Sequence, residues 1–336
     1  MTVRTSRAHT ASELLFGCFA FFCLLLILRN AEIAVEYMTR GLLLCARTVI
    51  PSLFPFMILS ELVVTSGLAD RLLARLCAPM CRVLRLPTGG CVALILGLLC
   101  GFPVGARCAI AAYERGELSR EGCERVLGAA SPPSSAFVMG AVGVSLWSNR
   151  ALGISLYLSV IASALLTCLF TSRRASPVPV APIPIRTQPS LGAAKFTGAV
   201  RASTESMLLI CAYVVFFSAL TGTLGMALSS LGANETLRAV LTAIFEMSSG
   251  VSALSALSPV APALILSAAT LGWSGLSVHC QMLALCQGHD LSLRTYFLSK
   301  LLQALLCALI CALLIHFFPS IFMPTECRAL GNIYLL

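Results

Sequence analysis

The sequence predicts an all-α polytopic membrane protein with two inverted-topology repeats and re-entrant or broken helices. Of its 336 residues, 58% are hydrophobic and 11% are charged, and the mean hydropathy is +0.92, whereas soluble domains carry about 25% charged residues. Several runs are apolar on nearly every face and long enough to cross or enter a bilayer. They cover residues 14–28, 51–68, 88–110, 151–170, 207–224, 260–271 and 301–318. Breaks rich in Gly or Pro interrupt or end such runs at comparable places in the two halves.

The first element, residues 1–30, is predicted to be an N-terminal membrane span. Arg4 and Arg7 precede its apolar run, as they would in a secretory signal. However, Arg29 and Asn30 follow the run, where a cleavage site would need small residues. We therefore expect an uncleaved span whose N-terminus lies inside the cell.

The remaining chain divides into two comparable halves. A first repeat covers residues 31–171, a Pro-rich cytoplasmic linker covers 172–201, a second repeat covers 202–318, and a short tail covers 319–336. Alternating prolines in the linker favour an extended, semi-rigid conformation. In each repeat, an apolar break at Gly101 or Gly272 is followed at a similar distance by an acid-Leu-Ser turn. This recurrence in the same order argues for a duplication.

Basic connections predict the orientation of the halves. Residues 71–85 contain four arginines and residues 173–201 contain five basic residues, so both connections are expected in the cytoplasm. The run at 51–68 would then cross inward and the matching run at 207–224 outward, which makes the repeats inverted. Inverted repeats with short, Gly- or Pro-interrupted segments are typical of secondary transporters.

The breaks themselves predict a binding site. A helix that begins after Pro103 would point free N–H groups into a cavity and favour an anion, with Arg107 one turn further on. The alternative is a continuous span kinked at Pro103, with Arg107 snorkelling to the surface; the second break favours the hairpin. The expected substrate-binding residues are Gly101, Phe102, Pro103, Gly105, Arg107, Gly272, Gly275, Ser277, His279 and Gln281.

Acidic residues within apolar runs supply candidate polar partners. Glu61 and Glu246 are expected to bind a coupling ion or to form a polar pocket. A carboxylate within the membrane costs free energy to bury and is therefore by default functional. Glu205 lies near a predicted helix start, where an acid simply favours the helix dipole. His279 could carry a proton or pack as a neutral side chain.

Other classes of function are disfavoured. Many of the sixteen cysteines sit singly in or beside apolar runs, without a paired CxxC pattern, so neither a metal nor another cofactor is expected. Scattered basic residues argue against a nucleic-acid partner. The chain has no Ser/His/Asp motif, P-loop or GxGxxG, and we therefore expect no enzyme.

Four motifs together carry a family resemblance. They are PSLFPF at 51–56 with Ser60-Glu61, GFPVGA at 101–106, FVMGAVG at 137–143 and GLSVHCQ at 275–281. Over roughly residues 41–317 the chain resembles the nucleoside-recognition or Gate-domain membrane proteins, most closely their sporulation branch, the YlbJ type. It departs from that pattern at 131–135, where SPPSS replaces the expected single Ser-Pro, and in its short tail.

The resemblance implies a protein distantly similar to concentrative nucleoside carriers. The sporulation branch is associated with moving dipicolinic acid, a small aromatic dicarboxylate, across a forespore membrane. We therefore expect a secondary transporter for a small organic anion, specifically dipicolinate, in a bacterial cell membrane or forespore membrane. Its partners are the anionic substrate and the lipid bilayer, and a homo-oligomer is left open. The alternatives are a nucleoside-type carrier with a neutral pocket and a non-transporting scaffold for spore-envelope assembly.

Overall fold

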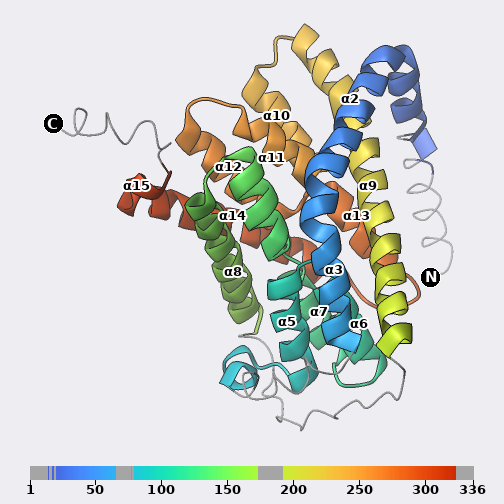
Figure 1. The fold of residues 1–336 in the computed structure, drawn as a ribbon, viewed down its shortest axis with the longest axis vertical. Coiled ribbons are helices and arrows are strands. Elements are labelled where there is room, and N and C mark those ends of the chain that lie inside the picture. Colours follow the sequence, from blue (N-terminus) through green and yellow to red (C-terminus); the bar gives the residue numbers. More distant parts are fainter. Residues whose placement is uncertain are drawn as a thin grey trace, which may run out of the picture.

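The computed structural model describes residues 14, 17–18, 20–65, 77, 79–172 and 192–322. Within these residues the regular elements are all helices (Figure 1), as the sequence predicts. In chain order they include α2 (Ala31–Leu44), η1 (Cys45–Val49), α3 (Ile50–Thr65), α5 (Thr88–Cys100), α6 (Val104–Glu114), α7 (Arg120–Ala129), η2 (Ala136–Leu146), α8 (Arg150–Ser172), α9 (Gly192–Ser230), α10 (Glu235–Phe245), α11 (Met247–Ser255), α12 (Val260–Trp273), α13 (Gly275–Leu285), α14 (Arg294–Phe317) and α15 (Pro319–Phe322).

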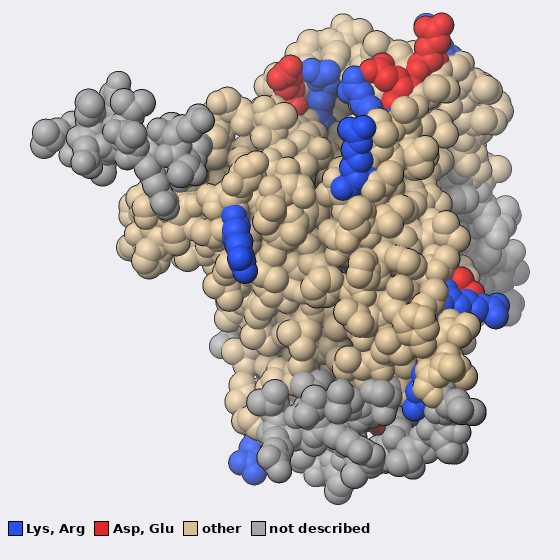
Figure 2. All heavy atoms as spheres, in the orientation of Figure 1, with Lys and Arg blue, Asp and Glu red and all other residues tan. Residues whose placement is uncertain are grey.

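Several helical stretches are long and apolar enough to cross a membrane. They cover Ala31–Val63, Arg150–Ser172, Gly192–Ser230, Val260–Leu285 and Arg294–Phe317. Figure 2 shows charged side chains gathered at the top of this face and few over its middle, which is uncharged except for charged side chains at its left and right margins. The predicted class of polytopic membrane protein is confirmed.

Two predicted boundaries differ from the structure. The predicted run at 51–68 is the second part of one longer stretch that begins at residue 31. Residues 192–201, predicted as the end of the linker, belong to α9, because their sequence has no proline to interrupt a helix. Most of the linker and of the tail lies outside the described residues.

The first hairpin is formed by α5 and α6, which pack along each other. The chain reverses between Gly101 and Pro103, at the predicted break. A Cβ on Gly105 would lie closer than 3.0 Å to the Cα of Gly97 and to the carbonyl oxygen of Ala130. Only glycine therefore lets α6 approach both α5 and the end of α7 this closely.

The second hairpin, formed by α10 and α11, turns at Glu246. Here a Cβ on Gly250 would lie closer than 3.0 Å to the backbone of Ala243. Figure 1 shows the two hairpins toward opposite ends of the molecule, α5 and α6 at the bottom and α10 and α11 at the top. Inverted repeats would place their hairpins in opposed positions, and the repeats themselves stay a prediction.

Two further breaks interrupt helices without reversing the chain. Residues 131–134 separate α7 from η2 without regular structure, and Ser274 separates α12 from α13 within one apolar stretch. The order of hairpin, broken helix and long helix thus occurs twice, ending in α8 and in α14. In this order the counterpart of the Gly101 turn is the Glu246 turn, whereas the sequence analysis paired Gly101 with Gly272.

Candidate functional site

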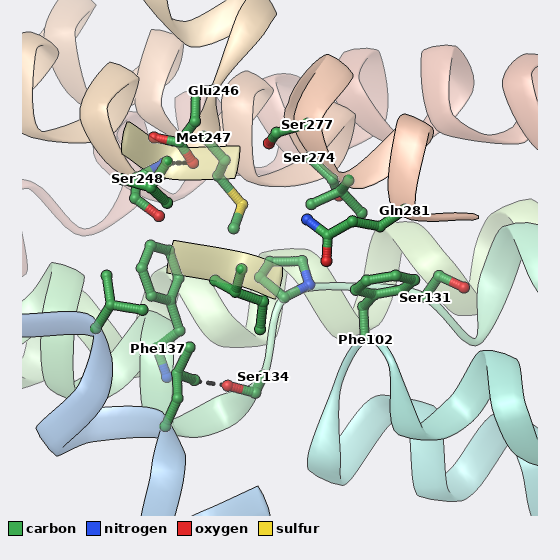
Figure 3. A pocket seen from close by; sticks show the side chains of 16 residues that line it. Phe102, Ser131, Ser134, Phe137, Glu246, Met247, Ser248, Ser274, Ser277 and Gln281 are labelled. Carbon is green, nitrogen blue, oxygen red and sulfur yellow. Dashed lines mark hydrogen bonds between the residues drawn. The ribbon is translucent and has the colours of Figure 1, made fainter. Parts of the chain in front are cut away.

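A cavity lies where the two hairpin tips meet the two broken helices (Figure 3). It has about 550 Å³ of empty space, including its open mouth. Its lining residues are Val49, Leu53, Phe102, Ser131, Pro133, Ser134, Phe137, Ile210, Val214, Glu246, Met247, Ser248, Ser274, Ser277, Val278 and Gln281. Both halves of the chain therefore contribute a hairpin tip, a helix break and a wall to the same space.

The tip of the first hairpin is fixed against the break of its own half. Gly101 has φ +77°, and a Cβ there would lie 2.5 Å from the Cα of Ser134. The N–H of Phe102 donates to the carbonyl oxygen of Pro132 at 2.9 Å. Only glycine at residue 101 lets the hairpin tip lie this close to Ser134. Gly101 therefore positions the tip, and the next residue, Phe102, lines the cavity.

The second tip is held in the same manner. Gly275 has φ +82°, and a Cβ there would lie 2.9 Å from the backbone nitrogen of Met247. The indole Nε1 of Trp273 donates to the carbonyl oxygen of Ile244 at 3.0 Å. The predicted residue Gly275 thus joins the second break to the second tip.

Glu246 is the acid of the cavity. Its side chain is 2% exposed, and its two carboxylate oxygens accept hydrogen bonds from the backbone N–H groups of Ser248 at 2.9 Å and Ser249 at 2.6 Å. It is therefore the N-cap of α11, and it occupies the helix end where an external anion would otherwise bind. The sequence analysis placed this residue in a polar pocket, and the structure brings it there.

Two polar side chains of α13 face the cavity without partners. Ser277 is 2% exposed and Gln281 is 5% exposed, and within the described part of the chain neither side chain forms a hydrogen bond. Figure 3 shows the Gln281 amide turned toward the space between the two tips. The first turn of α13 also has no side-chain cap. A ligand could satisfy these groups, since buried polar groups normally have partners.

His279 lies on the same helix but does not line the cavity. Its ring Nδ1 lies 2.9 Å from the hydroxyl oxygen of Tyr296, and its ring contacts Trp273 and Phe297 edge to face. Its Nε2 is buried and has no hydrogen-bond partner. This environment is mainly aromatic packing.

The other predicted residues lie outside the lining. Arg107 donates from Nη2 to the hydroxyl of Ser206 on α9 at 2.7 Å, and Glu61 lies on α3, partly exposed. Pro103 and Gly105 are buried in the first hairpin. Gly272 packs against α14, where a Cβ would lie 2.5 Å from the carbonyl oxygen of Gln303. The cavity therefore brings together Phe102, Ser277, Gln281 and Glu246 from the predicted set.

The first helix break also lines the cavity, and none of its residues was among the predicted site residues. Ser131, Pro133 and Ser134 line the cavity, and the hydroxyl of Ser134 accepts from the N–H of Phe137 at 3.2 Å. Two adjacent prolines between serines mark a helix interruption. That signal was present in the sequence and could have identified this wall.

A second, more open cavity lies behind the second hairpin. It has about 1080 Å³ of empty space including its mouth, and it is bounded by residues of α2, α9, α10 and α11, among them Arg40 and Arg238. Ser249 lines this outer space, whereas its neighbour Ser248 lines the central cavity. The first turn of α11 is therefore the partition between the two spaces.

The fold and this site define an integral membrane protein with a cavity between two helical hairpins and two broken helices. The chain is similar to the sporulation integral membrane protein YlbJ of Bacillus subtilis (strain 168). The two are 26% identical over an alignment 328 positions long, which covers 87% of this chain and 80% of that protein. No family model matches the chain, and no solved structure matches it significantly.

Proposed function

We propose that this protein is a secondary transporter, related to the Gate-domain carriers, that moves a small organic anion across a membrane during sporulation. The observation that carries the proposal is the convergence of four chain breaks, two from each half, on one cavity. Backbone that leaves helical structure at membrane depth is tolerated where it is buried in protein or lines a cavity. Interrupted helices at matching places in two repeats are the usual position of a transporter's substrate site.

Helix N-termini favour an anionic substrate. Four helices begin at the breaks: α6 at Val104, η2 at Ala136, α11 at Met247 and α13 at Gly275. Each start brings the positive end of a helix dipole to the region of the cavity. Glu246 occupies the N-terminus of α11, which leaves the other starts and the unpartnered groups of α13 to a ligand.

Dipicolinate is the specific substrate that we propose. This choice rests on the family resemblance and is in keeping with the name of the Bacillus relative, a sporulation protein. The cavity suits a flat aromatic acid in one further respect, since Phe102 and Phe137 both line it and can pack against a ring.

A nucleoside is the second candidate, and one observation favours it. The described lining residues include no Lys or Arg and do include an acid, Glu246. Arg107, the expected anion ligand, binds Ser206 instead. A neutral, hydrogen-bonding substrate would suit such a lining. The scaffold alternative predicts that the polar lining residues have no effect on any solute.

Uptake into proteoliposomes tests these candidates. Labelled dipicolinate and labelled uridine would be offered to the purified protein and to two variants, Gln281→Leu in the cavity and Gln287→Leu at an exposed position just after α13. Saturable dipicolinate uptake that is lost in Gln281→Leu and kept in Gln287→Leu supports the proposal. Uptake of uridine alone would replace it with the nucleoside carrier, and uptake of neither would favour the scaffold.

A further inference from the structure

Lys300 is a fully buried lysine that contacts the first helix break, on the side away from the cavity lining. It lies in α14 with 0% of its surface exposed. Its Nζ donates to the carbonyl oxygen of Ser131 at 2.9 Å and to the side-chain oxygen of Gln303 at 3.3 Å. Within the described ranges no carboxylate forms an ion pair with it.

Such a charge is costly and needs a physical reason. Burial of an ammonium group without a carboxylate partner normally costs several kcal/mol, and ionisable groups within membrane helices are by default functional. Part of the compensation is the end of α7, whose terminal carbonyl groups carry the negative end of a helix dipole.

The neighbouring side chain shows that this helix end needs no charge. Nε2 of Gln303 donates to the carbonyl oxygen of Gly128 at 2.7 Å, so a neutral amide already satisfies one terminal carbonyl of α7. A neutral donor at residue 300 could satisfy Ser131 in the same way. Capping explains the hydrogen bond but not the presence of an ionisable side chain at this position.

The position of the charge relative to the cavity supplies an explanation. Ser131, whose carbonyl oxygen binds the ammonium group, also lines the cavity. The acid Glu246 lies at the second tip, where both of its oxygens are already bonded. A positive charge on Lys300 would therefore act on the ligand space from behind the first break, although no cationic side chain among the described lining residues reaches that space.

We propose that Lys300 supplies the charge that determines the specificity of this site. It favours an anionic ligand over a neutral one through the wall that Ser131 helps to form, and it does not contact the ligand. This inference rests on the proposed function and names the residue that would make the cavity select a carboxylate. If a singly charged group of the ligand lay about 8 Å from the ammonium group, Coulomb's law with an effective dielectric constant of about 20 would change its affinity by about thirtyfold.

The test compares two ligands of the same shape and different charge. Affinities of the purified protein for dipicolinate and for its neutral diamide, pyridine-2,6-dicarboxamide, would be measured by equilibrium binding and competition. The wild type is expected to prefer dipicolinate. Lys300→Gln, which keeps a donor near Ser131 but removes the charge, should lose at least about tenfold of that preference. Lys300→Arg, which keeps the charge, should retain most of it.

A second variant keeps the inference testable if Lys300→Gln does not fold. Gln303→Glu places a carboxylate beside the ammonium and should also lower the preference for dipicolinate. Equal losses of affinity for both ligands, or an unchanged preference in the folded variants, would overturn the inference and leave Lys300 as a helix cap. A wild type that binds dipicolinate without preferring it would do the same. Binding of neither ligand by the wild type would instead reject the proposed function.

Discussion

Replacement of Gly105 by alanine should open the first hairpin. The added Cβ would lie closer than 3.0 Å to the Ala130 carbonyl oxygen and to the Cα of Gly97. Carbon atoms pack best at about 3.5–4.0 Å, and both neighbours are backbone atoms that cannot rotate away. Helix α6 must therefore move away from α5 and from the end of α7, and it would carry the tip residue Phe102 out of its position in the cavity wall.

The expected size of this effect follows from overpacking. Insertion of one methyl group into a filled interior costs about 1–3 kcal/mol and occasionally more, whereas alanine in a helix otherwise gains about 1 kcal/mol over glycine. Gly140→Ala is the matched control, because the nearest atom to its Cβ would be the Ser52 Cβ at 4.0 Å. The two variants thus differ in packing space, and each adds the same methyl group to a helical glycine.

The assay is the thermal unfolding midpoint of each purified variant in detergent, together with dipicolinate uptake. One kcal/mol corresponds to about 2–4 °C in proteins of moderate size, so Gly105→Ala should melt several degrees below the wild type and lose most uptake. Gly140→Ala should melt at or above the wild-type midpoint. If Gly105→Ala has the same unfolding midpoint as Gly140→Ala and takes up dipicolinate normally, the close approach of α5 and α6 is not as described.

Two other substitutions test the assignments around the cavity. Glu246→Ala removes the acceptor for the N–H groups of Ser248 and Ser249, so we expect a loss of about 2–4 kcal/mol, seen as a lower unfolding midpoint, and a smaller loss for Glu246→Gln; equal midpoints for all three proteins would refute the capping role. Arg107→Ala removes one hydrogen bond to Ser206, and dipicolinate uptake should stay within about twofold of wild type because residue 107 does not line the cavity. A folded Arg107→Ala protein that no longer takes up dipicolinate would return Arg107 to the substrate site.

Composition and turn chemistry predicted much of the fold. Long apolar runs indicated the membrane class, and proline between glycines at 101–105 located the first tip. The second tip has no such signal, because the chain turns at Phe245-Glu246-Met247 without glycine or proline. The sequence identified Glu246 as an intramembrane acid. It did not show that this residue caps α11 and so allows the chain to turn there.

Whether a side chain points into the cavity or away from it was harder to predict. In a soluble helix the polar side marks the solvent, but a helix in lipid is apolar on its outer face as well as its inner face. Arg107 and Glu61 could therefore not be assigned to the cavity or away from it by periodicity. Lys300 stands at the start of an apolar run, where a charge ordinarily marks a membrane boundary, and the contact of α14 with the first break reveals its burial.

The most direct test of the account is a structure determined at saturating dipicolinate. We expect the ligand to lie in the central cavity, to contact both hairpin tips and to receive hydrogen bonds from Ser277 and Gln281. We also expect a carboxylate of the ligand to face the Ser131 wall. A ligand bound outside this cavity, or held by one half of the chain alone, would contradict the claim that the four breaks form one substrate site.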